Sequence, residues 1–167
     1  MQSIITPQTQ GGSNLEETLI ILKPDTVQRG LIGDIISRIE RRGLRIAALK
    51  MIWIDRELAE KHYHEHEGKH FYEPLLEFIT SSPVVVLLVR GPEAVAVLRV
   101  MMGATDSKQA APGTIRGDYG LSNRHNLLHG SDSAESAKRE VELFFTPEEI
   151  HAYPRVVEPW ADPDAEW

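Results

Sequence analysis

The chain has 167 residues, a net charge of −7 and no cysteine, which excludes disulfides, thiolate nucleophiles and cysteine-based metal sites. Its 41% hydrophobic and 26% charged residues are typical of one globular domain, and the acidic balance argues against a nucleic-acid-binding scaffold. No apolar run approaches the roughly 20 residues that span a bilayer, and residues 1–14 lack the apolar core of a signal peptide. We therefore expect a soluble cytoplasmic protein.

The N-terminal part of the chain predicts a tail, a strand and a helix. Residues 1–16 are polar, so we expect a flexible tail before a single domain over 17–167, which ends in a Pro-rich extension. Residues 18–22 form an apolar run that predicts a buried strand, and Pro24 ends it because proline cannot continue a central ladder. Apolar residues within 31–39 recur at helical spacing, and Gly43 is placed to end that helix.

The middle of the chain alternates between strand and helix patterns. Residues 44–54 are rich in apolar and β-branched side chains and predict a second strand, followed by helical stretches over 56–66 and 71–79. Residues 84–89 are the clearest strand, and we expect another helix to begin at Gly91–Pro92.

The last third of the chain begins with an irregular segment. Residues 103–124 show no regular period, and a loop of about 20 residues in a compact domain is usually functional or disordered. A short strand over 126–129 and a helix over 133–142, capped by Ser133, are predicted next. This order favours an α+β fold: a ferredoxin-like βαββαβ antiparallel sheet covered by helices, with the long loop before His129.

Polar side chains with functional chemistry gather in and after this loop. Thr105, Arg116 and Asn126 are donors suited to phosphate or ribose oxygens, and arginine binds phosphate with paired N–H groups. Lys23 directly follows the first strand, so it is placed to project into a cleft. No glycine-rich phosphate loop, dinucleotide fingerprint or protein-kinase signature occurs, so side chains would have to hold any nucleotide.

His129 is the candidate nucleophile. Apolar Leu127–Leu128 precedes it and Gly130 follows it, and a neutral imidazole is a competent nucleophile near pH 7. The role requires one free ring nitrogen and an acceptor on the other, which Glu140 supplies if the last helix folds back. A lone histidine in a polar loop is otherwise usually a structural residue.

Four segments together resemble the nucleoside diphosphate kinase family. Residues 126–133 read N-L-L-H-G-S-D-S and match the family's active-site signature N-x-x-H-G-S-D. The segments at 23–30, 99–105 and 112–118 resemble the first-strand motif and the phosphate-binding motifs, in family order and spacing.

The resemblance implies a ping-pong reaction. His129 would accept the γ-phosphoryl group of a nucleoside triphosphate, typically ATP, and pass it to a nucleoside diphosphate. The implied supporting residues are Lys23 at the phosphates and ribose, Arg99, Thr105 and Arg116 at the phosphates, Asn126 at the ribose, Phe71 and Leu75 at the base, Tyr63 beside the histidine, and Glu140 and Ser131 behind it. Mg²⁺ would be carried by the nucleotide phosphates without protein ligands.

The resemblance also implies self-association. Family members are typically hexamers and some are tetramers, and we favour a hexamer because the loop over 103–124 needs a neighbour to hold it. The chain departs from the family at Thr26, where most members carry glycine, and at Asn123 and His125, where apolar residues and arginine are frequent. We expect Thr26 to alter the loop after Lys23, and the departures together to affect base-side detail and the electrostatics of the cleft but not the nucleophile.

Each assignment has an ordinary structural alternative. Arg99 alone would be a helix-surface charge, Glu140 a solvated helix residue, and Phe71 with Leu75 a core pair at i, i+4 spacing. Four histidines, His62, His64, His66 and His70, invite a metal interpretation, but we favour a solvated face. The alternative function is a non-catalytic nucleotide-binding regulatory module on the same fold.

Overall fold

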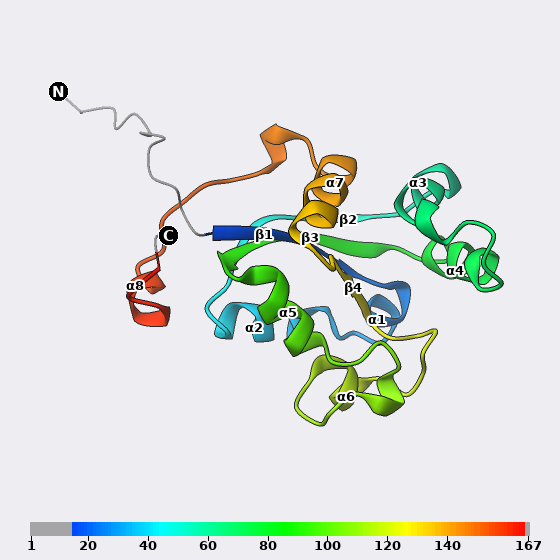
Figure 1. Cartoon of the computed structure of the whole chain (residues 1–167), viewed down its shortest axis with the longest axis horizontal. Helices are drawn as coiled ribbons and strands as arrows, with labels where there is room; N and C mark the ends of the chain where they lie inside the picture. The colour runs from blue at the N-terminus through cyan, green and yellow to red at the C-terminus, as the bar shows by residue number, and fades with distance from the viewer. Residues whose placement is uncertain (1–14, 166–167) are drawn as a thin grey trace.

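The computed structural model describes residues 15–165, which form a four-stranded antiparallel sheet with helices on both faces (Figure 1). Strand order is β2-β3-β1-β4. The strands are β1 Leu15–Leu22, β2 Arg45–Ile52, β3 Val84–Pro92 and β4 Leu128–Gly130. This arrangement confirms the predicted α+β, ferredoxin-like class.

Eight α-helices and three short 3₁₀ helices surround the sheet in the described residues. The α-helices are α1 Pro24–Gln28, α2 Ile32–Arg41, α3 Arg56–His62, α4 Tyr72–Ile79, α5 Ala94–Met102, α6 Ile115–Tyr119, α7 Ala134–Phe144 and α8 Glu158–Ala161. The 3₁₀ helices are η1 His64–His66, η2 Ser107–Gln109 and η3 Pro147–Glu149. None of the helices in 15–165 is long and apolar enough to cross a bilayer.

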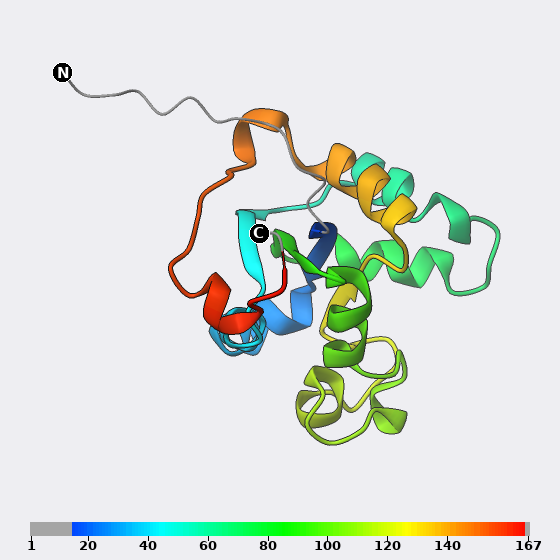
Figure 2. The same cartoon turned by 60° about the vertical axis from the view of Figure 1, so that its left-hand side comes forward.

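The two central strands are apolar on both faces, because helices cover both sides of the sheet. In β1, Leu19 and Ile21 face one core while Ile20 and Leu22 face the other, as the two-residue period of a strand requires. The first core is closed by α3, α4 and α7, and the second by α2, α5 and α6 (Figure 2). The continuous apolar runs that predicted these strands therefore reflect burial on both faces.

Two sequence predictions about strand ends were wrong for one shared reason. Strand β3 continues to Pro92 instead of giving way to a helix at Gly91, and β1 already begins at Leu15, inside the predicted tail. The extra residues pair with each other: Leu15 with Pro92 and Glu16 with Gly91. The rest of the predicted tail, residues 1–14, lies outside the described residues.

The segment over 103–124 is more regular than predicted. It contains η2 and α6, and Thr114 caps α6 by accepting a hydrogen bond from the Gly117 amide at 3.0 Å. A helix of five residues is too short to show periodicity, and among its side chains only Ile115 and Arg116 are buried.

The C-terminal extension wraps around the surface beside β2. The His151 amide donates to the Ala47 carbonyl at 2.8 Å, and Arg155 donates to the Gly43 and Leu44 carbonyls. A buried ion pair between Arg45 and Glu158 holds α8 in place. The Pro-rich extension is therefore ordered and is held against β2 and the residues just before it.

Candidate active site

Strand β4 determines where His129 points. It is an edge strand, and His129 pairs with Ile21, so its side chain faces the side of the sheet that α3 and α7 cover. The neighbouring Leu128 faces the opposite core. The His129 side chain keeps 23% of its surface exposed, which leaves the imidazole half-buried and reachable.

The turn before β4 is held by several contacts. Leu127 adopts a left-handed conformation with φ of 74°, which is unfavourable for a branched side chain. Its carbonyl accepts hydrogen bonds from the Lys23 amide at 2.8 Å and the Thr26 hydroxyl at 2.5 Å, while its amide donates to Asp25 at 3.0 Å. Thr26, the departure from glycine, is fully buried and thus stabilises the strained turn directly.

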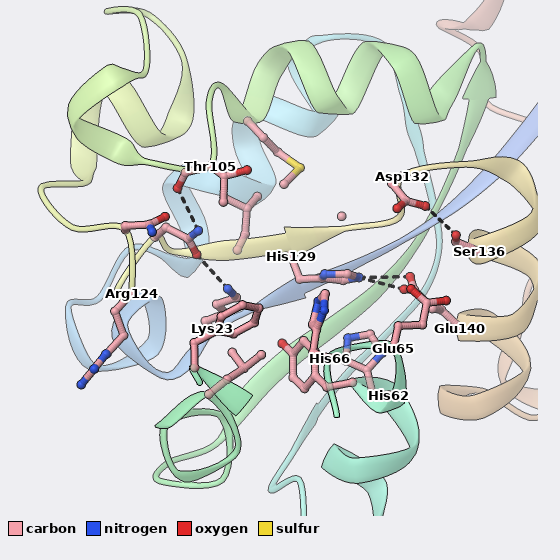
Figure 3. A pocket seen from close by; sticks show the side chains of 18 of the residues that line it. Lys23, His62, Glu65, His66, Thr105, Arg124, His129, Asp132, Ser136 and Glu140 are labelled. Atoms are coloured by element: carbon pink, nitrogen blue, oxygen red, sulfur yellow. Dashed lines mark hydrogen bonds and ion pairs between the residues drawn. The ribbon is translucent and has the colours of Figure 1, made fainter. Parts of the chain in front are cut away.

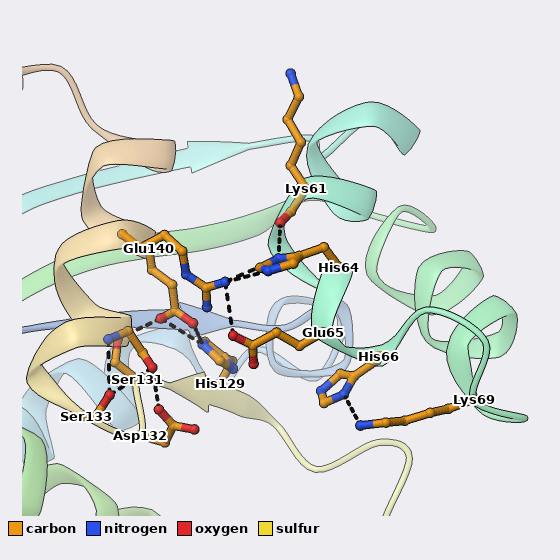
Figure 4. A network of polar contacts seen from close by, with 12 residues as sticks. Lys61, His64, Glu65, His66, Lys69, His129, Ser131, Asp132, Ser133 and Glu140 are labelled. Carbon is orange, nitrogen blue, oxygen red and sulfur yellow. Dashed lines mark hydrogen bonds and ion pairs between the residues drawn. The ribbon is translucent and has the colours of Figure 1, made fainter.

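Glu140 orients the His129 ring. Its two carboxylate oxygens both lie 3.1 Å from Nε2 of His129, and Ser131 Oγ donates to the same carboxylate at 2.6 Å (Figure 4). Burial favours the neutral acid, but the hydrogen bonds from His129 and Ser131 outweigh it and lower the pKa of Glu140. An ionised Glu140 accepts the proton on Nε2, which leaves the lone pair on Nδ1.

Two aromatic residues at the end of α3 line the other side of the imidazole. The His62 ring stands edge-on to His129, with centroids 4.6 Å apart, and the Tyr63 ring is 6.4 Å away. The predicted solvated histidine face is wrong for His62, which is 6% exposed. It follows Ala59 by three residues and so shares the buried face of α3. Burial lowers the pKa of His62 and raises that of Tyr63.

The other end of the site is a chain of hydrogen bonds around Lys23. Its Nζ donates to Asn126 Oδ1 at 2.8 Å, and Asn126 Nδ2 donates to the Thr105 carbonyl at 3.0 Å (Figure 3). Burial, with a further contribution from nearby Arg116, lowers the pKa of Lys23 to about 8. Burial therefore destabilises the charged form of Lys23, and a bound anion would stabilise it.

Arg116 organises the backbone of the site. Its guanidinium donates to three carbonyls: Asn126 at 3.0 Å, Gly103 at 3.0 Å and Leu128 at 2.7 Å. Burial and the charge of Arg99 lower its pKa to about 10, so it still carries a proton at neutral pH. Arg116 thus joins the loop after α5 to β4 while its charge remains at the cavity.

These groups surround one cavity of about 680 Å³. All the sequence-predicted site residues line it except Ser131, which lies behind Glu140. The predicted residues in the lining are Lys23, Tyr63, Phe71, Leu75, Arg99, Thr105, Arg116, Asn126, His129 and Glu140. Although the protein is acidic, Lys23 and several arginines line this cavity together with the apolar Phe71 and Leu75. The cavity therefore suits an anionic ligand that also has an apolar part.

Comparison with known proteins identifies the family. A family model described as "Nucleoside diphosphate kinase" matches residues 16–150. The chain belongs to the nucleoside diphosphate kinase family. It is 62% identical to the enzyme of that name from Pyrococcus furiosus over 144 residues, covering 84% of this chain and 89% of the relative. A Listeria monocytogenes relative is 54% identical over 146 residues, covering 87% of this chain and 99% of the relative.

The fold matches solved structures of the same family. The structure of a halophilic nucleoside diphosphate kinase from Halobacterium salinarum in complex with CDP superposes with a TM-score of 0.86 at 49% identity, covering 87% of this chain and 97% of that one. A Babesia bovis family member superposes with a TM-score of 0.85 at 43% identity, with coverage of 87% and 99%. This nucleoside diphosphate kinase is therefore an enzyme that transfers a phosphoryl group between nucleoside triphosphates and diphosphates.

Sequence reasoning missed several residues of the kinase cavity. The sequence pattern predicts a solvated face for His62 and no role for Arg124 or Arg139, yet all three line the cavity. Arg139 lies on α7 and contacts Glu65 at 3.1 Å and the His64 ring, which ties α7 to η1 across the site. Only its position next to Glu140 marked it in the sequence. The departure Asn123 lines the cavity, whereas His125 stacks on Phe78 with centroids 4.5 Å apart.

Proposed function

We propose that this nucleoside diphosphate kinase works by a ping-pong mechanism in which His129 is the nucleophile. The observation that carries the proposal is the hydrogen bonding of Nε2 to both oxygens of Glu140 at 3.1 Å. Nδ1 then attacks the γ-phosphorus of a nucleoside triphosphate, a P–N bond forms, and the bond to the bridging oxygen breaks. The nucleoside diphosphate leaves with that electron pair, and a second diphosphate reverses the sequence.

The cationic residues of the cavity supply the charge stabilisation that phosphoryl transfer needs. Lys23, Arg99 and Arg116 place three positive charges around the space in front of His129, and Thr105 adds a neutral donor. Asn126 is held by Lys23 and the Thr105 carbonyl, which prepares its amide for the ribose hydroxyls. These groups position the phosphates in line with Nδ1.

At the base end of the cavity we place the apolar side chains Phe71 and Leu75, which cannot form hydrogen bonds that would distinguish one base from another. Phe71 is 40% exposed and lines the cavity together with Leu75. A stacking ring and an aliphatic wall accept the face of any base and read few of its edges. We therefore expect broad acceptance of nucleotides.

The charge of the cavity fits a divalent cation that arrives with the nucleotide, and we propose Mg²⁺. Of its lining carboxylates, Glu140 is engaged by His129, Glu65 by Arg139, and Asp132 accepts from Ser136 at 2.5 Å. When carried on the phosphates, Mg²⁺ would neutralise part of the charge that develops during phosphoryl transfer. Because these carboxylates already have partners and the lining has more cationic side chains than carboxylates, we assign no protein ligand to Mg²⁺.

Self-association is proposed on the basis of an exposed apolar row at the edge of the sheet. Leu49, Met51 and Trp53, on and just after edge strand β2, are 50%, 56% and 65% exposed. An exposed edge strand offers unpaired backbone groups to another chain, and an exposed apolar patch marks an interaction surface. We favour a hexamer over a tetramer, in the cytoplasm, and light scattering that gives a monomer would contradict the assembly.

Labelling with γ-labelled ATP tests the mechanism. After an alkaline quench, which preserves phosphohistidine, the wild type should retain label and release it when any nucleoside diphosphate is added. His129→Ala should retain none, whereas His151→Ala, which changes an exposed histidine outside the cavity lining, should label like the wild type. A wild type that binds ATP without ever labelling would show a non-catalytic nucleotide-binding module instead.

A further inference from the structure

Three metal-ligating side chains meet at one end of the cavity. His62 at the end of α3, His129 on β4 and Glu140 on α7 each offer a ligand atom within 4.8 Å of the other two. In Figure 3 they lie at the end of the site opposite Lys23 and Thr105. Two imidazoles with one carboxylate, leaving one position open, is the ligand set of many zinc sites.

The His62 ring has no hydrogen-bonding partner to explain its burial. It is 6% exposed, and neither Nδ1 nor Nε2 makes a hydrogen bond. Buried polar atoms in proteins are nearly always satisfied, and leaving one unpaired costs free energy. The proposed phosphoryl-transfer mechanism assigns no role to the His62 ring, so the burial of its unpaired nitrogens beside His129 needs another explanation.

We propose that His62, Glu140 and Nε2 of His129 form a binding site for a divalent transition-metal ion of the zinc class, and that the bound ion switches off the nucleophile. An imidazole that binds a metal through Nε2 keeps its single proton on Nδ1. The proton that Glu140 now holds on Nε2 moves through solvent to Nδ1, so no proton is gained or lost. Nδ1 then has no lone pair with which to attack phosphorus.

The distances require only a local adjustment. Ligand atoms around a tetrahedral zinc with bonds of about 2.0–2.1 Å lie roughly 3.3 Å apart. Nε2 of His129 and the Glu140 oxygens, at 3.1 Å, already meet this spacing. One ring nitrogen of each histidine and one Glu140 oxygen all lie within 4.8 Å of one another, so His62 has to approach by an amount on the order of 1–2 Å. That movement breaks no hydrogen bond of its ring.

The surroundings support the ligands and discriminate between ions. Ser131 Oγ donates to Glu140 Oε2 at 2.6 Å, and its own oxygen accepts from the Leu19 amide at 3.2 Å. Such outer contacts orient a ligating carboxylate. Imidazole ligands favour zinc-class ions over Mg²⁺, which prefers oxygen. The Mg²⁺ that accompanies the nucleotide is therefore a poor competitor for this site.

Metal binding is tested without nucleotide, by titrating the full chain with Zn²⁺ in competition with a chromogenic chelator. We expect one tightly bound Zn²⁺ per chain, and Co²⁺ in its place should show the absorption of a tetrahedral site. His62→Phe should weaken Zn²⁺ binding by more than about 100-fold, and Ser131→Ala by about 10-fold, as expected for an outer-shell contact. His151→Ala is the matched control and should bind like the wild type.

Two results would overturn the proposed metal site. In the first, the wild type binds Zn²⁺ no more tightly than His62→Phe does. In the second, the Co²⁺ complex lacks the absorption of a tetrahedral site. If His62→Phe does not fold, Glu140→Gln removes another ligand and should lose binding in the same assay. These readouts report the metal alone, so they stand whether or not His129 is the nucleophile.

The switch, in contrast, rests on the proposed function and has its own test. In excess Mg²⁺, saturating Zn²⁺ should slow labelling of the wild type by γ-labelled ATP more than 10-fold, and a chelator should restore it. His62→Phe, whatever its own rate, should not be slowed further by Zn²⁺. If the Zn²⁺-free wild type never becomes labelled, the proposed phosphohistidine mechanism is refuted. Normal labelling of the Zn²⁺-loaded protein would refute the switch.

Discussion

The buried ammonium of Lys23 should make this enzyme less stable than a variant that lacks it. Burial lowers the pKa of Lys23 from 10.5 to about 8. At pH 7 the charged side chain therefore lowers the free energy of unfolding by about 3 kcal/mol. Lys23→Met removes that cost and keeps the length of the side chain. It also leaves Asn126 Oδ1 without its donor, a loss of about 1 kcal/mol. The variant should therefore be more stable by about 2 kcal/mol at pH 7.

The pH dependence of this difference has a definite sign. Between about pH 8 and pH 10.5 the unfolded chain holds a proton on Lys23 that the folded chain has released. The unfolding free energy of the wild type therefore rises with pH across this window, relative to a chain without the group. Because methionine does not titrate, the advantage of Lys23→Met should shrink as the pH approaches 10.

Urea unfolding at one protein concentration, at pH 7 and pH 9.5, measures both effects. Lys138→Met is the control, because it removes an exposed lysine that does not line the cavity. Lys23→Met should also lose most of its phosphoryl-transfer activity, since the phosphates lose a cationic partner. A variant less stable than the wild type at pH 7, or an advantage that is the same at both pH values, would refute the reasoning.

Four further predictions follow from the same contacts. Free-enzyme kcat/KM should fall above about pH 8 as Lys23 loses its proton, and a flat profile from pH 7 to 9.5 would contradict this. Glu140→Ala should slow His129 labelling about 100-fold in rapid-quench experiments, because the ring loses its orienting acceptor. Arg116→Met should leave the free energy of unfolding in urea within about 1 kcal/mol of the wild type, because the three carbonyls that lose their donor cost about as much as the relief of a buried charge contributes. Ser133→Ala removes the cap of α7 and should cost about 1 kcal/mol with an unchanged labelling rate.

Local patterns predicted the elements well where apolar runs or caps were strong. The strand over 84–89 and the helix capped by Ser133 appear as expected, because burial on both faces and a capped amphipathic helix leave clear traces in sequence. The ends of β1 and β3 escaped prediction because Leu15, Glu16 and Gly91 are strand residues only through pairing with each other's strand. Neither segment shows this by itself.

His62 illustrates the limit for the site. Its neighbours in sequence are charged and polar, so the local pattern indicated solvent. The ring is buried because the last turn of α3 packs against Phe144 of α7, more than 80 residues away, with centroids 5.3 Å apart. A contact of this kind has no local signature, because it depends on how two helices meet across the sheet.

The sequence by itself determined the kind of protein this is: an antiparallel α+β domain whose motifs carry a histidine, a lysine and two arginines in family order. Only the tertiary structure decided how these groups work together. Lys23 and Asn126 lie 103 residues apart in the chain and form a hydrogen bond, and Glu140 reaches His129 because α7 folds back over β4. Such contacts depend on strand register and helix packing, which arise from the whole core at once and not from any one segment.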